Sequence, residues 1–299
     1  FTPGVVTAIN LLLLSETEEG DEVLIQRPVY YPFADSIQQQ KRTVVNSPLH
    51  LKNGRYEIDF EDFEQKTASP QCKAFILSNP HNPVGRVYTE EELRRLGEIC
   101  LKHHVFVIAD EIHSDLIFPG HRHVVFASLG RDYAENCAVC HAPSKTFNLA
   151  GLSFSCILIP NQARRERFDR MFARYCRAHP NFFAPVAAKA AWDYGEDWLN
   201  SCLSYIQKND QFVREFAENT WHGDVWISPL EGTYLQWIDF RKLEPDPERL
   251  RQTMLYQARV AMDEGSMFGA EGNGFERLNL AAPRKVIAEI MDRIAAALR

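Results

Sequence analysis

The sequence predicts an α/β fold with a mostly parallel sheet flanked by helices, followed by a smaller α+β domain at the C-terminus. Short apolar runs rich in β-branched residues recur along the first part of the chain: Glu22–Gln26, Lys73–Ser78, Val105–Asp110, Asn136–His141 and Phe154–Ile159. Polar segments with helical character separate most of them, and this alternation is typical of parallel strands. After about residue 195 the pattern changes, which indicates a second architecture.

The clearest helix of the first part begins at Thr89. Glu92 follows three residues later and completes a capping-box pattern, and Leu93, Leu96 and Cys100 recur at helical spacing. The helix leads directly into the run that ends at Asp110. Because ligands of such sheets bind beyond the carboxyl ends of the strands, the polar residues after each run are candidate site residues.

In the second part we expect a helix over Trp198–Thr220, strands over Val225–Ile227 and Tyr234–Phe240, and then two more helices. The last helix, Arg284–Arg299, carries an apolar stripe that predicts a core face: Val286, Ile287, Ile290, Ile294 and Leu298. We therefore divide the chain into a large domain over residues 1–196 and a small domain over residues 197–299.

Composition and charge exclude several classes of partner. The 299 residues are 45% hydrophobic, and the formal net charge of −7 gives no electrostatic attraction for nucleic acid. The most apolar stretch, Ala8–Leu14, is far too short to span a membrane, and we recognise no signal peptide. Seven cysteines, an odd set in a chain that needs no disulfides, favour a reducing compartment, the cytoplasm.

Two patterns suggest a metal at first sight. Cys137 and Cys140 lie in an apolar run, where residues three apart point to opposite faces of a strand, so we expect two small buried side chains. The histidines near Asp110 have no helical ligand spacing. We predict no metal.

Lys145 is the most informative single residue, because it follows an apolar run and begins a loop, in Ser144-Lys145-Thr146-Phe147-Asn148. Most lysines are solvated, but a lysine in this setting can act as a reagent. Asn82, between Pro80 and Pro83, and Asp110 each follow an earlier run.

Taken in chain order, Asn82, Asp110, Lys145 and Arg277 resemble the pyridoxal 5'-phosphate (PLP) enzymes of fold type I, the aspartate aminotransferase superfamily. The stretches Asp-Glu-Ile-His, Ser-Lys-Thr-Phe-Asn and Arg-Leu-Asn resemble the MalY/PatB group of cystathionine β-lyases, also called cysteine-S-conjugate β-lyases. The resemblance covers essentially the whole chain. It implies a PLP cofactor, a sulfur amino acid as substrate and a homodimer.

The resemblance also assigns roles to residues. Lys145 would hold PLP as a Schiff base and later remove the α-proton of the substrate. Asp110 would keep the pyridine nitrogen protonated, and because a buried carboxylate is costly we expect a cation beside it. Asn82 would donate to the phenolate oxygen, and Tyr30 stands at the ring-stacking position, where a core tyrosine is nearly as plausible.

For the phosphate, the opening turn before the first helix offers the amides of Gly4, Val5 and Val6 at the positive end of the helix dipole. Ser144 adds a hydroxyl. The chain departs from the aminotransferases at Ala142, where they carry a serine, and at Ser153, where they carry an arginine. Two phosphate contacts must therefore come from elsewhere.

Arg277 would grip the α-carboxylate of the substrate as a two-pronged donor. The alternative, a surface salt bridge, is disfavoured by its apolar neighbours Phe275, Leu278 and Leu280. His113, which we place among the cofactor-binding residues, stands where aminotransferases carry a tyrosine, and this favours a lyase. An aminotransferase and a PLP-fold regulator with little activity remain as alternatives.

The start of the chain carries a separate expectation. Phe1 to Val6 match the point in the family where the phosphate-binding helix begins, and relatives carry a substantial segment before it. We expect the chain to be a fragment of a longer homodimeric enzyme that binds PLP weakly in this form.

Overall fold

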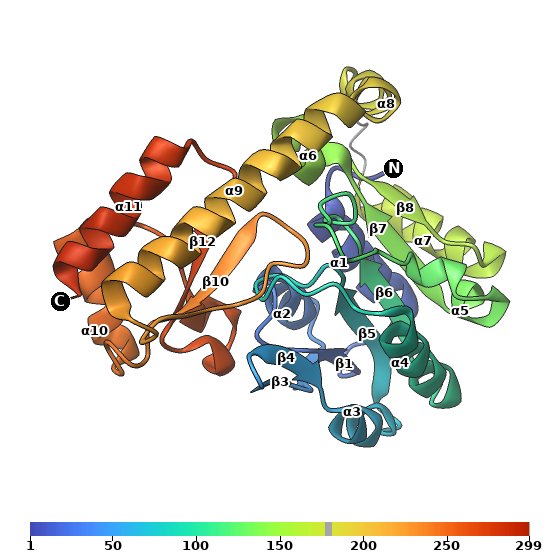
Figure 1. Ribbon diagram of the computed structural model, residues 1–299. Coiled ribbons are helices and arrows are strands. Elements are labelled where there is room, and N and C mark those ends of the chain that lie inside the picture. The colour runs from blue at the N-terminus through green and yellow to red at the C-terminus, as the bar shows by residue number, and fades with distance from the viewer. Residues whose placement is uncertain (177–180, 299) are drawn as a thin grey trace.

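The computed structural model describes residues 1–176 and 181–298. Its main sheet has six strands in the order β2-β1-β5-β6-β7-β8, and all neighbours are parallel except β7 and β8. The bounds are β1 Glu22–Ile25, β2 Thr43–Asn46, β5 Cys72–Ser78, β6 Phe106–Asp110, β7 Cys137–His141 and β8 Cys156–Leu158. The predicted mostly parallel sheet is confirmed (Figure 1).

Helices cover both faces of this sheet, because alternate strand residues point to opposite sides. On one face, Ile76 and Ile108 pack with α1 and α7; on the other, Phe75 and Val107 pack with α3 and α4. The helix bounds are α1 Val5–Glu16, α2 Pro32–Gln39, α3 Phe60–Thr67, α4 Glu90–Lys102, α5 Arg131–Glu135, α6 Pro143–Thr146, α7 Gln162–Tyr175 and α8 Ala184–Tyr194.

Two local predictions in this part are confirmed. The capping box at the start of α4 is formed, with the Thr89 and Glu92 side chains each accepting from the other's backbone amide. Cys137 and Cys140 are both buried, in the cores on opposite faces of the sheet. Each therefore serves packing, as its position on the strand requires.

A second sheet of four antiparallel strands has the order β11-β12-β10-β9. Its bounds are β9 Trp226–Ile227, β10 Leu235–Asp239, β11 Asp263–Glu264 and β12 Phe275–Asn279, and its helices are α9 Glu196–Trp221, α10 Pro247–Gln252, a π-helical turn Thr253–Ala258 and α11 Arg284–Ala297. The long helix and both strands expected here are present. α9 runs from the region of α6 and α8 to this sheet (Figure 1).

The last helix corrects one prediction. Ile287, Met291 and Ile294 are buried on α11, whereas Val286 is 45% exposed. Val286 therefore does not belong to the predicted core face, and Met291, which the prediction omitted, does. Arg299, the predicted end of this helix, lies outside the described residues.

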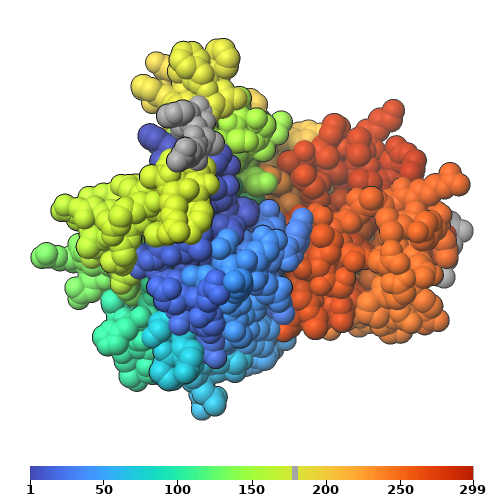
Figure 2. Space-filling model, turned by 180° about the vertical axis from the view of Figure 1, so that it is seen from behind, coloured from blue at the N-terminus to red at the C-terminus, as the bar shows by residue number. Residues whose placement is uncertain are grey.

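The two sheets form neighbouring lobes. Seen from behind in Figure 2, the orange and red C-terminal lobe lies beside the blue and green N-terminal part, and α8 projects above. A short hairpin, β3 Leu49–Lys52 and β4 Arg55–Ile58, belongs to the N-terminal part, and 3-10 turns occur at Phe126–Ser128, Ala150–Leu152, Gly265–Phe268 and Ala270–Gly272. None of the described helices combines the length and apolarity that crossing a membrane requires.

Candidate active site

One cavity of about 390 Å³ lies between the two sheets, at the carboxyl ends of β5, β6 and β7. Every residue that the sequence proposed for the site lines it: Gly4, Val5, Val6, Tyr30, Asn82, Asp110, His113, Ser144, Lys145 and Arg277. The parallel strands explain this gathering, because their carboxyl ends share one edge of the sheet. The individual roles of these residues remain predictions.

Asp110, the last residue of β6, is buried, and burial raises the pKa of its carboxyl to about 7. The Ile112 amide donates to it over 3.1 Å. Asp110 forms no ion pair with the described residues, so the cation expected beside it stays a prediction. The charge of Lys145, in the same cavity, only partly offsets the effect of burial on the pKa.

Lys145 lies in α6, the short helix that follows β7, and is half-buried. Burial lowers the pKa of its ammonium group, the charge of Arg277 lowers it further, and Asp110 opposes both effects. A lowered pKa leaves more of the amine neutral at physiological pH. A neutral amine is the form that can attack a carbonyl or accept a proton.

Arg277, on β12, is held by a carboxylate from the neighbouring strand. Asp263 on β11 stands directly opposite it and accepts from Nε over 3.1 Å and from Nη2. Nη1 donates to Oδ1 of Asn82 over 2.7 Å, and the guanidinium lies 4.9 Å above the Phe268 ring. Since a guanidinium has five N–H groups, one remains free on each terminal nitrogen, and together these two suit a carboxylate.

Asn82 is fixed from two sides. Its main-chain carbonyl accepts from the Tyr30 amide over 3.0 Å, and its side-chain oxygen accepts from Arg277. The acceptor end of its amide is thus occupied, which leaves the NH₂ group as a donor for a ligand. Tyr30 packs edge-on against Phe33 and is only partly buried, so one part of the ring faces the cavity.

His113 is buried, and its Nδ1 has no hydrogen-bond partner among the described residues. Burial, together with the charges of Lys145 and Arg277, lowers the pKa of the imidazole to about 3. The ring is therefore neutral at physiological pH. Tyr234, from the loop before β10, packs edge-on against it at 5.7 Å between ring centres.

The far end of the cavity is formed by the start of α1. Gly4 caps this helix with a φ of +114°, a backbone conformation that a side chain would strain. None of the side chains in the described part of the chain caps the helix, and no acidic residue lies in its first turn, so its amides remain available to an anion. Ser144 and Ser153 line the same region.

Sequence reasoning missed several of these residues. Asp263 was not considered, because only the register of β11 against β12 places it beside Arg277. Tyr234 was expected only as the start of a strand, and the packing of the two lobes is what brings its ring against His113. Within residues 1–176 and 181–298, no three His, Cys, Asp or Glu side chains gather in a metal-binding arrangement.

Comparison with known proteins gives consistent matches over the whole chain. The family described as "Aminotransferase class I and II" matches residues 1–294. Cystathionine beta-lyase PatB of Bacillus subtilis is 42% identical over 298 residues, covering 100% of this chain and 77% of PatB. Protein MalY of Escherichia coli is 30% identical over 300 residues, covering 100% of this chain and 76% of MalY.

A solved structure agrees with these sequence matches. Cystalysin from Treponema denticola, whose crystal structure contains a pyridoxal 5'-phosphate cofactor, superimposes with a TM-score of 0.97 at 40% identity. The match covers 99% of this chain and 75% of cystalysin.

Proposed function

The chain belongs to the aminotransferase class I and II family, within which it groups with PatB and MalY, and from this premise we propose that it is a PLP-dependent carbon–sulfur β-lyase. Its substrate is cystathionine or a related cysteine S-conjugate, which it cleaves to a thiol, pyruvate and ammonia. The observation that carries the proposal is the single cavity in which Lys145, Asp110, Asn82 and Arg277 meet.

The residues of the cavity fit PLP chemically. Asp110 is a buried carboxyl without an ion-pair partner among the described residues, and the protonated pyridine nitrogen is the cation that would complete it. The free NH₂ group of Asn82 suits the phenolate oxygen. The uncapped start of α1, with Gly4, and the Ser144 hydroxyl suit the phosphate.

When bound, PLP supplies an electron sink that makes the α-proton of an amino acid acidic. Lys145 holds the cofactor and then serves as the base that takes this proton at its Nζ, which its lowered pKa favours. Arg277 orients the substrate by its α-carboxylate through the two free N–H groups. His113 stays neutral, so its Nδ1, which has no partner among the described residues, can form a hydrogen bond with a ligand, and Tyr234 packs edge-on against its ring.

We also propose that the enzyme is a homodimer in the cytoplasm, with a large domain over residues 1–196 and a small domain over residues 197–299. Large exposed apolar side chains at α8 and the start of α9 support an interface between subunits: Phe182, Phe183, Val186, Tyr194 and Trp198. The seven cysteines are free, which suits a reducing compartment. The largest hydrophobic cluster of each lobe lies almost entirely within that lobe, which supports the division into domains, and a smaller cluster packs Tyr56 and Val84 against Trp237 where the lobes meet.

Product analysis with cystathionine tests the proposed reaction. PLP-loaded protein should release pyruvate and a thiol over many turnovers without an added keto acid. An aminotransferase would instead require a keto acid acceptor and yield pyridoxamine phosphate. A protein with only a regulatory role would bind PLP but would not turn over cystathionine, with or without a keto acid.

A further inference from the structure

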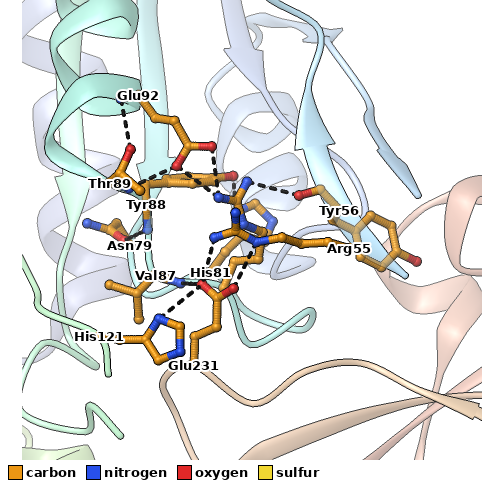
Figure 3. Close-up of polar contacts among 11 residues, drawn as sticks. Arg55, Tyr56, Asn79, His81, Val87, Tyr88, Thr89, Glu92, His121 and Glu231 are labelled. Atoms are coloured by element: carbon orange, nitrogen blue, oxygen red, sulfur yellow. Dashed lines mark hydrogen bonds and ion pairs between the residues drawn. The ribbon is translucent and has the colours of Figure 1, made fainter. Parts of the chain in front are cut away.

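An ion pair between a buried carboxylate and an arginine whose side chain is 41% exposed joins the two lobes beside the cavity. Glu231, in the loop between β9 and β10, has a side chain only 5% exposed, although it carries a charge. Nε and Nη2 of Arg55, on β4, donate to its two oxygens over 2.9 and 3.3 Å. The Val87 amide donates to Oε2 over 2.9 Å, and Nδ1 of His121 lies 3.9 Å from the same oxygen. Figure 3 shows Arg55, Val87 and His121 around this carboxylate.

The main chain around Glu231 is tied to the same neighbours. The amides of Glu231 and Gly232 both donate to the Gly85 carbonyl over 3.0 Å, and the Ser228 hydroxyl donates to the Val84 carbonyl over 2.6 Å. The approach is close, because a side chain added at Gly232 would meet Val87 at 2.9 Å. Residues 228–234 and 79–88 are therefore locked against each other.

A second ion pair, with a buried arginine, ties residues 79–88 to α4. Arg86 is 2% exposed and donates from Nη2 to both oxygens of Glu92 over 2.8 Å. Its Nη1 donates to the Tyr56 carbonyl over 2.9 Å. On β4, Arg55 belongs to the first ion pair, and the carbonyl of its neighbour Tyr56 accepts from the second. The hairpin and the two segments therefore form one polar cluster (Figure 3).

Both locked segments carry a wall of the cavity. Residues 79–88 contain Asn82, which contacts Arg277, and residues 228–234 end in Tyr234, which packs on His113. Glu231 itself does not line the cavity. The contacts of Glu231 therefore fix the position of Asn82, in one lobe, relative to Tyr234, in the other.

We propose that Glu231 is a positioning residue for the reaction proposed above, and that its pairing with Arg55 and the Val87 amide holds Asn82 and Tyr234 in register across the cavity. The proposal rests on the proposed function for its catalytic consequence. Its structural part, the locking of residues 79–88 to residues 228–234, stands on the contacts alone. Small displacements of site residues are costly, because a misplacement of about 1 Å can lower a rate by about 100-fold.

The test compares Glu231→Gln, Arg55→Met and their double variant in the PLP-loaded protein. Glu16→Gln is the matched control, since Glu16 is equally buried, at 3% exposure, and pairs with Arg164 and Arg167 far from both segments. Amide hydrogen exchange over residues 79–88 and 228–234, the PLP dissociation constant, kcat and KM are measured for each variant.

Glu231→Gln should accelerate exchange in both segments about tenfold or more and lower kcat/KM by about tenfold, whereas Glu16→Gln should leave both segments unchanged. The double variant should be no worse than Arg55→Met alone, because the two side chains act as a pair. If Glu231→Gln does not fold, Arg55→Lys, which keeps the charge but not the second hydrogen bond, replaces it.

Unchanged exchange in both segments, or the same change in Glu16→Gln, would overturn the proposal. If the unaltered protein cleaves no cystathionine, the proposed function fails but Glu231 is still tested. In that case faster exchange and weaker PLP binding in Glu231→Gln support the positioning role, and unchanged values of both overturn it.

Discussion

Two neighbouring groups of ionisable residues differ in how their buried side chains are compensated. Around Glu231, each carboxylate is paired with an arginine, as in Arg55–Glu231 and Arg86–Glu92. In the cavity, the buried side chains of Asp110 and His113 have no ionic partner among the described residues, and their pKa values are shifted so that the neutral forms are favoured. Paired groups hold the geometry of the protein, whereas unpaired groups are left for a ligand to complete.

The largest effect should come from removing the amine of the cavity. Lys145→Ala should lower the turnover of cystathionine by about 1,000-fold or more, because both the covalent hold on PLP and the base are lost. Steady-state pyruvate release measures this. A variant with even a tenth of the original activity would mean that another residue serves as the base.

Arg277 tests whether a residue can belong to both groups, since it pairs with Asp263 and also lines the cavity. Arg277→Lys should cost about 2–3 kcal/mol of transition-state stabilisation, calculated from kcat/KM, with PLP binding nearly unchanged. Arg241→Lys is the control, because Arg241 also lies over an aromatic ring and pairs with Asp239, outside the cavity. Equal kinetics for both variants would make Arg277 structural.

Glu276, the neighbour of Arg277 on β12, shows how a buried carboxyl with no ion pair among the described residues affects the free energy of unfolding. It is buried, and burial with the charges of Glu264 and Asp263 raises its pKa to about 8. The unfolded chain ionises near pH 4.5 while the folded protein keeps the proton, so this residue lowers stability progressively between pH 4.5 and about pH 8.

Glu276→Gln should therefore stabilise the protein by about 4 kcal/mol at pH 8 and little at pH 4.5. Urea unfolding at both pH values measures the difference, with Glu289→Gln on the exposed face of α11 as control. An increase in the free energy of unfolding that is the same at both pH values would contradict the raised pKa of Glu276 as the cause.

The smallest effect is expected for an ion pair that is exposed. Glu248 pairs with Arg251 at the surface, with 56% and 36% of their side chains exposed. Because solvent and salt screen such pairs, Glu248→Gln should leave the midpoint of urea unfolding unchanged. A clear loss of stability would show that pairing matters here without burial.

The sequence predicted the strands that are buried on both faces, since β5, β6 and β7 are continuous apolar runs. It did not predict the edge strand β2, with its exposed Thr43, or β12, where Glu276 and Arg277 interrupt the apolar pattern. Local pattern carries too little information for strands that are defined by their neighbours.

The same limit applies to the site. Asn82, Asp110 and Lys145 follow apolar runs and could be placed together by the rule for parallel sheets. The partners of the charged residues could not be found this way, because Glu231 meets Arg55 across a separation of 176 residues. Such pairs follow from the packing of the two lobes.

The central claim, that the unpaired groups of the cavity hold PLP on Lys145, is tested most directly by chemical labelling. PLP-loaded protein is reduced with borohydride, digested, and mapped for the pyridoxyl group by mass spectrometry. The label should lie on the peptide that contains Lys145 and disappear in Lys145→Ala. A label on another lysine, or no label on protein that has bound PLP, would contradict the account.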